Sequence, residues 1–148
     1  MKRWKASRVR LRPFRVEDAA DVCRIYPLFF LDNAIHIKGG RLTVADVGGR
    51  VVGFVLWSPA LERAWFDPTV SRWAELEELH VHRDLQNRGI GTRLVRAAVR
   101  QARDAGYQAM YLTTEGTNRP ARRAYEKAGF QEYDCVIRYK LRLSAKGA

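Results

Sequence analysis

The sequence is poor in the features that would place it in several familiar protein classes. Cysteine occurs only twice in 148 residues, at Cys23 and Cys135, without a CxxC or Cys/His ligand spacing, which argues against a disulfide framework or a cysteine-based metal site. No stretch approaches the roughly 20 consecutive apolar residues of a membrane-spanning helix. The basic first ten residues also lack a following apolar run of signal-peptide length. We therefore expect a cytoplasmic protein with no membrane partner.

Acidic residues are scarce relative to basic ones. The chain has 16 Asp and Glu against 27 Lys and Arg, a formal net charge of +11, so an anionic partner is plausible on electrostatic grounds. A nucleic acid, an acidic membrane surface or a phosphorylated cofactor would each satisfy that charge. Repeats, low-complexity tracts and linkers are also missing, and 148 residues are enough for a single sizeable core. The sequence predicts one domain over residues 1–148.

Hydrophobic periodicity and turn residues predict an alternation of strands and helices. A hairpin is the clearest element, because β-branched residues flank the turn Val47-Gly48-Gly49. Helices are predicted at residues 17–26, within 27–40, at 89–105 and at 118–128. Strands are predicted at residues 7–11, 42–46, 50–57, 73–82, 110–114, 130–133 and 136–143. This order favours a three-layer α/β domain, with helices on the faces of a mixed sheet.

The most informative segment joins the predicted strand at 73–82 to the long predicted helix at 89–105. It reads Gln86-Asn87-Arg88-Gly89-Ile90-Gly91. Glycines let the backbone approach a phosphate closely, and the first N–H groups of a helix have no partner inside it. A glycine-bearing turn at a helix N-terminus is therefore suited to binding phosphate oxygens, and Arg88 adds a positive charge there.

The segment at residues 81–92, VHRDLQNRGIGT, resembles the acetyl-coenzyme A (acetyl-CoA) binding signature of the GNAT family of N-acetyltransferases, Gln/Arg-x-x-Gly-x-Gly/Ala. A second family element follows at the usual distance, in the stretch NRPARRAYEKAGF that contains Asn118 and Tyr125. Together with the strand order, the two elements cover most of the chain. The resemblance implies an α/β, three-layer GNAT-type fold, in which a mixed and mostly antiparallel sheet of about 6–7 strands is flanked by about four helices.

The resemblance also implies an activity and a cofactor site. The activity is direct transfer of the acetyl group of acetyl-CoA, a co-substrate, to a primary amine of a protein N-terminus, a lysine side chain or a small molecule, and no metal is implied. The pantetheine arm is expected where the fourth strand diverges from the fifth, beside Leu79, His80 and Val81. Asn118 is expected to contact the cofactor, and Tyr125 to face its sulfur. The pyrophosphate site is expected to comprise Gln86, Asn87, Arg88, Gly89, Ile90, Gly91 and Thr92.

Acetyl transfer to an amine needs an unprotonated nucleophile, and alkyl amines, with a pKa near about 10, are mostly protonated at neutral pH. The candidate bases are Glu75, Glu77 and Glu78, and by resemblance an acid in the first half of their strand favours Glu75 or Glu77. The alternative for each is an edge carboxylate that faces water or pairs with an arginine. Strict alternation puts Glu75 and Glu77 on one face with Leu79 and Val81, and Glu78 on the other with His80 and His82. A bulge would shift this pattern by one residue.

The departing thiolate also needs a proton, and Tyr125 is the predicted donor. A tyrosine hydroxyl with a reference pKa near about 10 can hand over a proton without being a strong acid in the ground state. The alternatives are that Tyr125 is a core residue of its helix and that Asn118 is only a helix N-cap.

Other interpretations remain open. His80 and His82 alternate like metal ligands but have no evident third ligand, and they are alternative bases. Arg93, Arg96, Arg100 and Arg103 form a basic helix face, which is typical of a solvated surface but suits an anionic cofactor or an acidic partner. The other function classes are a basic nucleic-acid or ribosome-binding module, which the glycine turn and Tyr125 disfavour, and an acetyl-CoA sensor without turnover. Homodimers are common in the family, but no sequence feature demands one.

Overall fold

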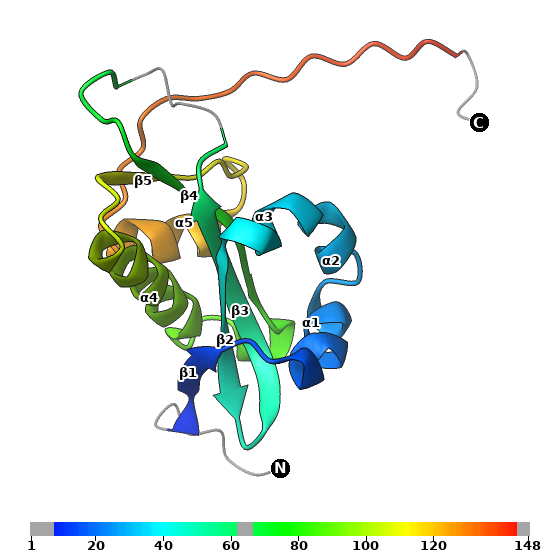
Figure 1. Cartoon of the computed structure of the whole chain (residues 1–148). Coiled ribbons are helices and arrows are strands. Elements are labelled where there is room, and N and C mark those ends of the chain that lie inside the picture. Colours follow the sequence, from blue (N-terminus) through cyan, green and yellow to red (C-terminus); the bar gives the residue numbers. More distant parts are fainter. Residues whose placement is uncertain (1–7, 62–66, 145–148) are drawn as a thin grey trace.

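The computed structural model describes residues 8–61 and 67–144, and in this part of the chain a five-stranded sheet lies between two layers of helices (Figure 1). Its strands are β1 (Arg10–Pro13), β2 (Arg41–Val47), β3 (Arg50–Pro59), β4 (Trp73–Val81) and β5 (Ala109–Tyr111), in that spatial order. The first four strands pair antiparallel, and β5 runs parallel to β4. The predicted three-layer α/β class and the mixed, mostly antiparallel sheet are therefore confirmed.

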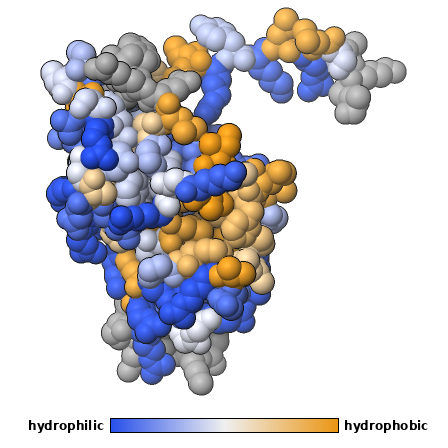
Figure 2. All heavy atoms as spheres, in the orientation of Figure 1, coloured by the Kyte–Doolittle hydropathy of each residue, from blue (hydrophilic) through white to orange (hydrophobic). Residues whose placement is uncertain are grey.

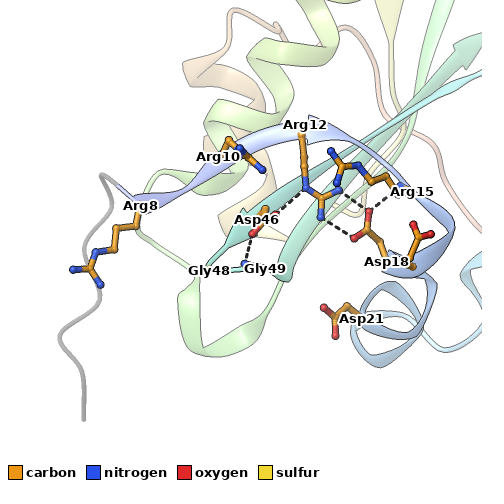
Figure 3. Close-up of a pocket in the computed structure, with 10 residues that line it drawn as sticks. Arg8, Arg10, Arg12, Arg15, Asp18, Asp21, Asp46, Gly48 and Gly49 are labelled. Atoms are coloured by element: carbon orange, nitrogen blue, oxygen red, sulfur yellow. Dashed lines mark hydrogen bonds and ion pairs between the residues drawn. The ribbon is translucent and has the colours of Figure 1, made fainter.

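The predicted hairpin forms β2 and β3. Gly48 and Gly49 both have positive φ values, 59° and 88°, which suits a tight turn whose twist matches that of the flanking strands. The first strand begins three residues later than predicted, at Arg10, while Ser7 lies outside the described residues. The edge strand β1 is fastened by Arg12, whose guanidinium donates to Asp46 of β2 and to Asp18 (Figure 3). This cluster lines a depression of about 610 Å³.

The two helical layers cover opposite faces of the sheet (Figure 1). One layer consists of a 3₁₀ turn (Val16–Asp18), α1 (Ala19–Ile25), α2 (Phe29–Asp32) and α3 (Ala34–Gly39). Its core includes Val22, Phe29, Phe54 and Leu56. The other layer consists of α4 (Ile90–Asp104) and α5 (Arg119–Lys127), and α4 buries Leu94, Val95 and Ala98 against β3 and β4. A short 3₁₀ turn (Arg83–Leu85) precedes α4. The predicted helix and loop within residues 27–40 are thus two short helices.

The two predicted closing strands are wrong. Residues 131–143 have no regular secondary structure and extend away from the sheet (Figure 1). The described part of the chain therefore has five strands rather than 6–7, and five α-helices rather than four. The physical reason is that alternating side chains define the faces of a strand but supply no hydrogen-bonding partner. The neighbouring edge is that of β5, which has only three residues and offers few main-chain groups for pairing. The apolar side chains from Tyr133 to Leu143 stay exposed as a result (Figure 2).

Candidate active site

The edge of β4 is open beyond its first residues. The pairing of β4 with β5 extends only from Trp73 to Glu75, so among the described residues no strand lies beside the remainder of that edge. The N–H of His82 donates to the carbonyl of Val52 on β3, and main-chain groups alternate between the two edges of an antiparallel strand. The main-chain groups of His80 therefore face β3, whereas those of Leu79 and Val81 face the open side.

The glycine turn lies next to this open edge. Asn87 and Gly89 both have positive φ values, 61° and 80°, and Gly89 is the N-cap of α4. The first main-chain hydrogen bond back to Gly89 comes from Arg93, so the N–H groups of Ile90, Gly91 and Thr92 precede the helical ladder. A Cβ on Gly89 would meet no atom within 4 Å. Left-handed residues before a helix N-terminus form a concave array of N–H groups that fits phosphate oxygens.

The remaining turn residues and Gly91 connect this site to its surroundings. Gln86, Asn87 and Arg88 are exposed, and Nε2 of Gln86 donates to the carbonyl of Val81 at 3.2 Å. A Cβ on Gly91 would lie 3.8 Å from the Cβ of Ala124 on α5. This is an ordinary van der Waals distance, so α5 packs beside the start of α4 and the space at Gly91 would admit a Cβ.

Asn118 and Tyr125 lie at the start and near the end of α5. The side-chain oxygen of Asn118 accepts a hydrogen bond from the N–H of Ala121 at 3.4 Å, so Asn118 is an exposed N-cap. Tyr125 is half-buried and packs edge-on against Phe130. Burial, and secondarily the negative charge of Glu78, raises the pKa of Tyr125 to about 12. Its hydroxyl is therefore fully protonated at neutral pH.

A β-bulge in β4 determines where the acidic residues point. Leu56 of β3 lies opposite Glu78, but the next residue, Trp57, lies opposite Leu76, so Glu77 is an extra residue in the ladder. Strict alternation is therefore wrong here. Leu76 still faces the α4 core, and the bulge allows two consecutive residues, Glu77 and Glu78, to face the α1–α3 layer.

Glu77 is the most enclosed acid of the site. Its side chain is 9% exposed, and Oε1 accepts a hydrogen bond from the hydroxyl of Ser58 at 2.7 Å. Nδ1 of His36 on α3 lies 3.1 Å from the same oxygen, at ion-pair distance but without the alignment of a hydrogen bond. Burial raises the pKa of Glu77, the charge of Glu75 adds to this effect, and the Ser58 hydroxyl opposes it. A carboxylate with a raised pKa is a stronger base than an ordinary one.

The other two acids are also held by neighbouring side chains. The hydroxyl of Tyr111 on β5 donates to Glu75 at 2.9 Å. Oε1 of Glu78 accepts from Asn33 at 3.2 Å, and Oε2 lies 2.7 Å from Nε2 of His80. The ring of His80 faces the α1–α3 layer, where it stacks on Tyr26.

None of the three acids makes an ion pair with Lys or Arg among the described residues, although the chain carries a net charge of +11. The α1–α3 side of β4 is therefore a negatively charged site, suited to a cationic acceptor.

Several of these contacts have no sequence signal. His36, Asn33 and Ser58 are single polar residues in unremarkable contexts, and only the strand register brings Ser58 opposite Glu75. Unlike His80, His82 makes a local contact: its Nδ1 accepts a hydrogen bond from the N–H of Asp84 and so caps a turn. Among the described residues, no three His, Cys, Asp or Glu side chains are grouped to hold a metal ion. No helix in the described part combines the length and apolarity required to cross a membrane.

Comparison with known proteins agrees with this geometry. The model of the acetyltransferase (GNAT) family matches residues 8–130. The chain is 30% identical over 153 residues to the uncharacterized N-acetyltransferase YhfO of Bacillus subtilis, covering 93% of this chain and all of that protein. It is 32% identical over 100 residues to mycothiol acetyltransferase of Pseudarthrobacter chlorophenolicus, covering 68% of this chain but only 30% of that relative.

Solved structures share the fold. Aminoglycoside N-acetyltransferase AAC(6')-Iy in complex with CoA superimposes with a TM-score of 0.75 over 90% of this chain and 99% of that one, at 20% identity. The family match over residues 8–130 and the common fold lead to one conclusion: the chain belongs to the acetyltransferase (GNAT) family.

Proposed function

We propose that the protein is an acetyl-CoA-dependent N-acetyltransferase that transfers the acetyl group directly to a primary amine. The observation that carries this proposal is the pair of groups on either side of the open edge of β4. Three carboxylates without an arginine or lysine ion pair among the described residues face one side. A tyrosine that is fully protonated at neutral pH stands on the other.

The co-substrate would bind chiefly through main-chain groups. The main-chain groups of Leu79 and the N–H of Val81 on the open side suit the amides of a pantetheine arm, which would add to the sheet where β5 ends. The carbonyl of Val81 already accepts from Nε2 of Gln86. The N–H groups from Gly89 to Thr92 suit the pyrophosphate, and Arg88 supplies positive charge. Open space above Gly89 supports this assignment, because a bulky group can approach the backbone there.

Glu77 is the proposed general base, and Glu75 supports it by raising its pKa. Glu77 would take a proton from the acceptor ammonium, directly or through water. The freed nitrogen then attacks the thioester carbonyl carbon and forms a C–N bond as the C–S bond breaks. A base with a raised pKa removes this proton near neutral pH more effectively than an ordinary carboxylate.

Tyr125 is the proposed proton donor to the departing thiolate. The nearby charge of Glu78 contributes to keeping the tyrosine protonated until the thiolate forms. Cys23 and Cys135 are free thiols, and neither belongs to this arrangement, which supports direct transfer without a covalent enzyme intermediate.

The negative charge around β4 supports a cationic acceptor, such as a lysine side chain, a protein N-terminus or a small amine. Two free cysteines support a reducing compartment such as the cytoplasm. The exposed apolar residues of the C-terminal segment support a homodimer, because such side chains are commonly covered by a partner. A single N-acetyltransferase domain over residues 1–148 accommodates all of these assignments.

Turnover by the full chain tests the proposal. Acetyl-CoA is mixed with free lysine, a peptide with a free N-terminus or spermidine, thiol release is followed, and the acetylated amine is identified by mass spectrometry. Tyr125→Phe should lower turnover by about 10²-fold or more with unchanged CoA affinity. Tyr107→Phe is the matched control, because Tyr107 packs on Trp57 and Arg72 away from the β4 acids.

The outcomes distinguish an N-acetyltransferase from an acetyl-CoA sensor without turnover. Thiol release that no amine accelerates, with CoA bound, would favour a sensor and overturn the proposal. Equal losses in Tyr125→Phe and Tyr107→Phe would remove Tyr125 from the chemistry.

A further inference from the structure

A groove lined by arginines runs between β1 and α4, across the sheet from the β4 acids. Its volume is about 590 Å³. The lining residues are Arg8, Val9, Arg10, Leu11, Arg93, Arg96 and Arg100. Five of these seven residues are arginines and none is acidic, and hydrophilic side chains gather over α4 in Figure 2. Among the described lining residues positive charge is therefore concentrated, although Asp46 of β2 lies close enough to Arg10 for that charge to contribute to lowering the pKa of Asp46.

Two of the arginines are held in place by the main chain. Nη2 of Arg93 donates to the carbonyl of Val9 at 3.1 Å, and Nη2 of Arg96 donates to the carbonyl of Lys127 at 3.1 Å. A guanidinium has five N–H donors, so each retains others for a ligand. Side chains that are already ordered lose less conformational entropy when a ligand binds.

The other arginines of the groove are available. Within the described residues, Arg10 and Arg100 make no hydrogen bond or ion pair. Arg12 of the same strand differs, because dashed lines in Figure 3 join it to Asp18 and Asp46, whereas none reaches Arg10. The arginine that forms ion pairs is therefore outside the groove, whereas Arg10 interacts with Asp46 through its charge alone.

The chemistry of the groove favours a peptide over a nucleic acid. Guanidinium groups bind both carboxylates and phosphates, but among the described lining residues the apolar ones are Val9 and Leu11, and none is aromatic. Grooves for single-stranded nucleic acid usually supply aromatic side chains on which bases stack. The wall is also an edge strand, β1, beside which an extended peptide fits.

The spacing of the helix arginines agrees with an extended ligand. Arg93, Arg96 and Arg100 are separated along the α4 axis by about 4.5 and about 6 Å, at about 1.5 Å per residue. Alternate residues of an extended chain are about 6.6 Å apart. Flexible arginine side chains easily cover the difference.

We propose that this arginine groove binds an extended acidic segment of a protein partner, with Glu or Asp at alternate positions facing α4. The groove and the β4 acids lie on opposite faces of the sheet, so the inference is independent of the acetyl transfer. If the same partner carries the acceptor amine, docking raises its local concentration at the active site.

Fluorescence anisotropy of labelled peptides tests the proposal. An alternating Glu-Ser peptide should bind the full chain at low salt, and an alternating Gln-Ser peptide of the same length should not. Arg10→Gln/Arg100→Gln should weaken binding of the acidic peptide about tenfold. Arg138→Gln/Arg142→Gln, which removes the same charge from the C-terminal segment, should change it less than twofold.

Three results would overturn the proposal. The first is tighter binding of a single-stranded RNA of equal charge, with the same dependence on Arg10 and Arg100. The second is an equal loss in both double variants, which would mean that net charge alone attracts the peptide. The third is no binding of the acidic peptide at low salt. CoA affinity, measured in parallel, separates failure of the groove from failure of the proposed enzyme, since Arg10→Gln/Arg100→Gln should bind CoA like the wild type.

Discussion

Substitution of Gly89 is the most direct test of the phosphate site. This residue combines a positive φ of 80° with open space where a Cβ would stand. Gly89→Glu therefore places a carboxylate in the region proposed for the pyrophosphate. We expect the variant to fold normally and to lose affinity for CoA.

The expected magnitudes follow from the local geometry. An L-residue in the left-handed conformation costs about 1–2 kcal/mol, and a carboxylate at a helix N-terminus returns about 0.3–1 kcal/mol. The free energy of unfolding should thus fall by about 1 kcal/mol. Two unit charges 4 Å apart repel by about 4 kcal/mol at an effective dielectric constant near 20. If side-chain rotation and solvent halve this energy, about 2 kcal/mol remains, which corresponds to about 30-fold weaker binding.

Calorimetric titration of CoA, with thermal unfolding in parallel, provides the assay. Gly48→Glu is the matched control, because Gly48 also has a positive φ, 59°, and open space around its Cβ position, but lies in the β2–β3 turn. It should bind CoA within twofold of the wild type. A folded Gly89→Glu that binds CoA within threefold of the wild type would refute the phosphate site. Equal weakening by both substitutions would instead point to net charge.

Three further predictions concern the base, the β1 cluster and the C-terminal segment. Glu77→Gln should remove the acidic limb of the pH–rate profile. In the wild type the midpoint of that limb should lie above the ordinary carboxylate pKa, because burial raises the pKa of Glu77. Persistence of the limb in the variant would exclude Glu77 as the base. Arg12→Met should lower the free energy of urea unfolding at pH 7 by about 3 kcal/mol. Arg12 lowers the pKa of Asp18 and Asp46, so their contribution is complete above about pH 4 and is lost as the pH falls further; a variant as acid-sensitive as the wild type would contradict this origin. Deletion of residues 136–143 should leave CoA affinity unchanged but reduce the mass measured by light scattering at high concentration, and an unchanged mass would contradict the homodimer.

The glycine turn and the elements around it were predictable because their signals are local. Gly89 has a conformation that favours glycine, and α4 has a regular apolar period ended by Gly106. The β2–β3 hairpin likewise depends on its own turn residues, Gly48 and Gly49. Each of these features is specified by a few neighbouring residues, so one sequence suffices to locate it.

The features that sequence reasoning missed depend on pairing between distant segments. Whether Glu77 is an extra residue in the ladder depends on how β4 registers against β3, and His36 reaches it from a separate helix. The closing strands were expected from alternation within residues 130–143, but a strand also requires a partner edge. Alternation of apolar and polar residues determines which side chains share a face of a strand. Strand register and the choice of partner strand are properties of the folded sheet.

The extra residue in β4 also affects how relatives are to be compared. Glu77 and Glu78 are adjacent in the sequence yet serve the same face, which a regular strand forbids. Loss of the codon for Glu77 would leave Leu76 and Glu78 in a continuous ladder and would remove one acid from the site. In an alignment, such a relative would show a one-residue gap inside a strand. A gap in that place would indicate loss of the proposed general base, although gaps within strands are ordinarily attributed to misalignment.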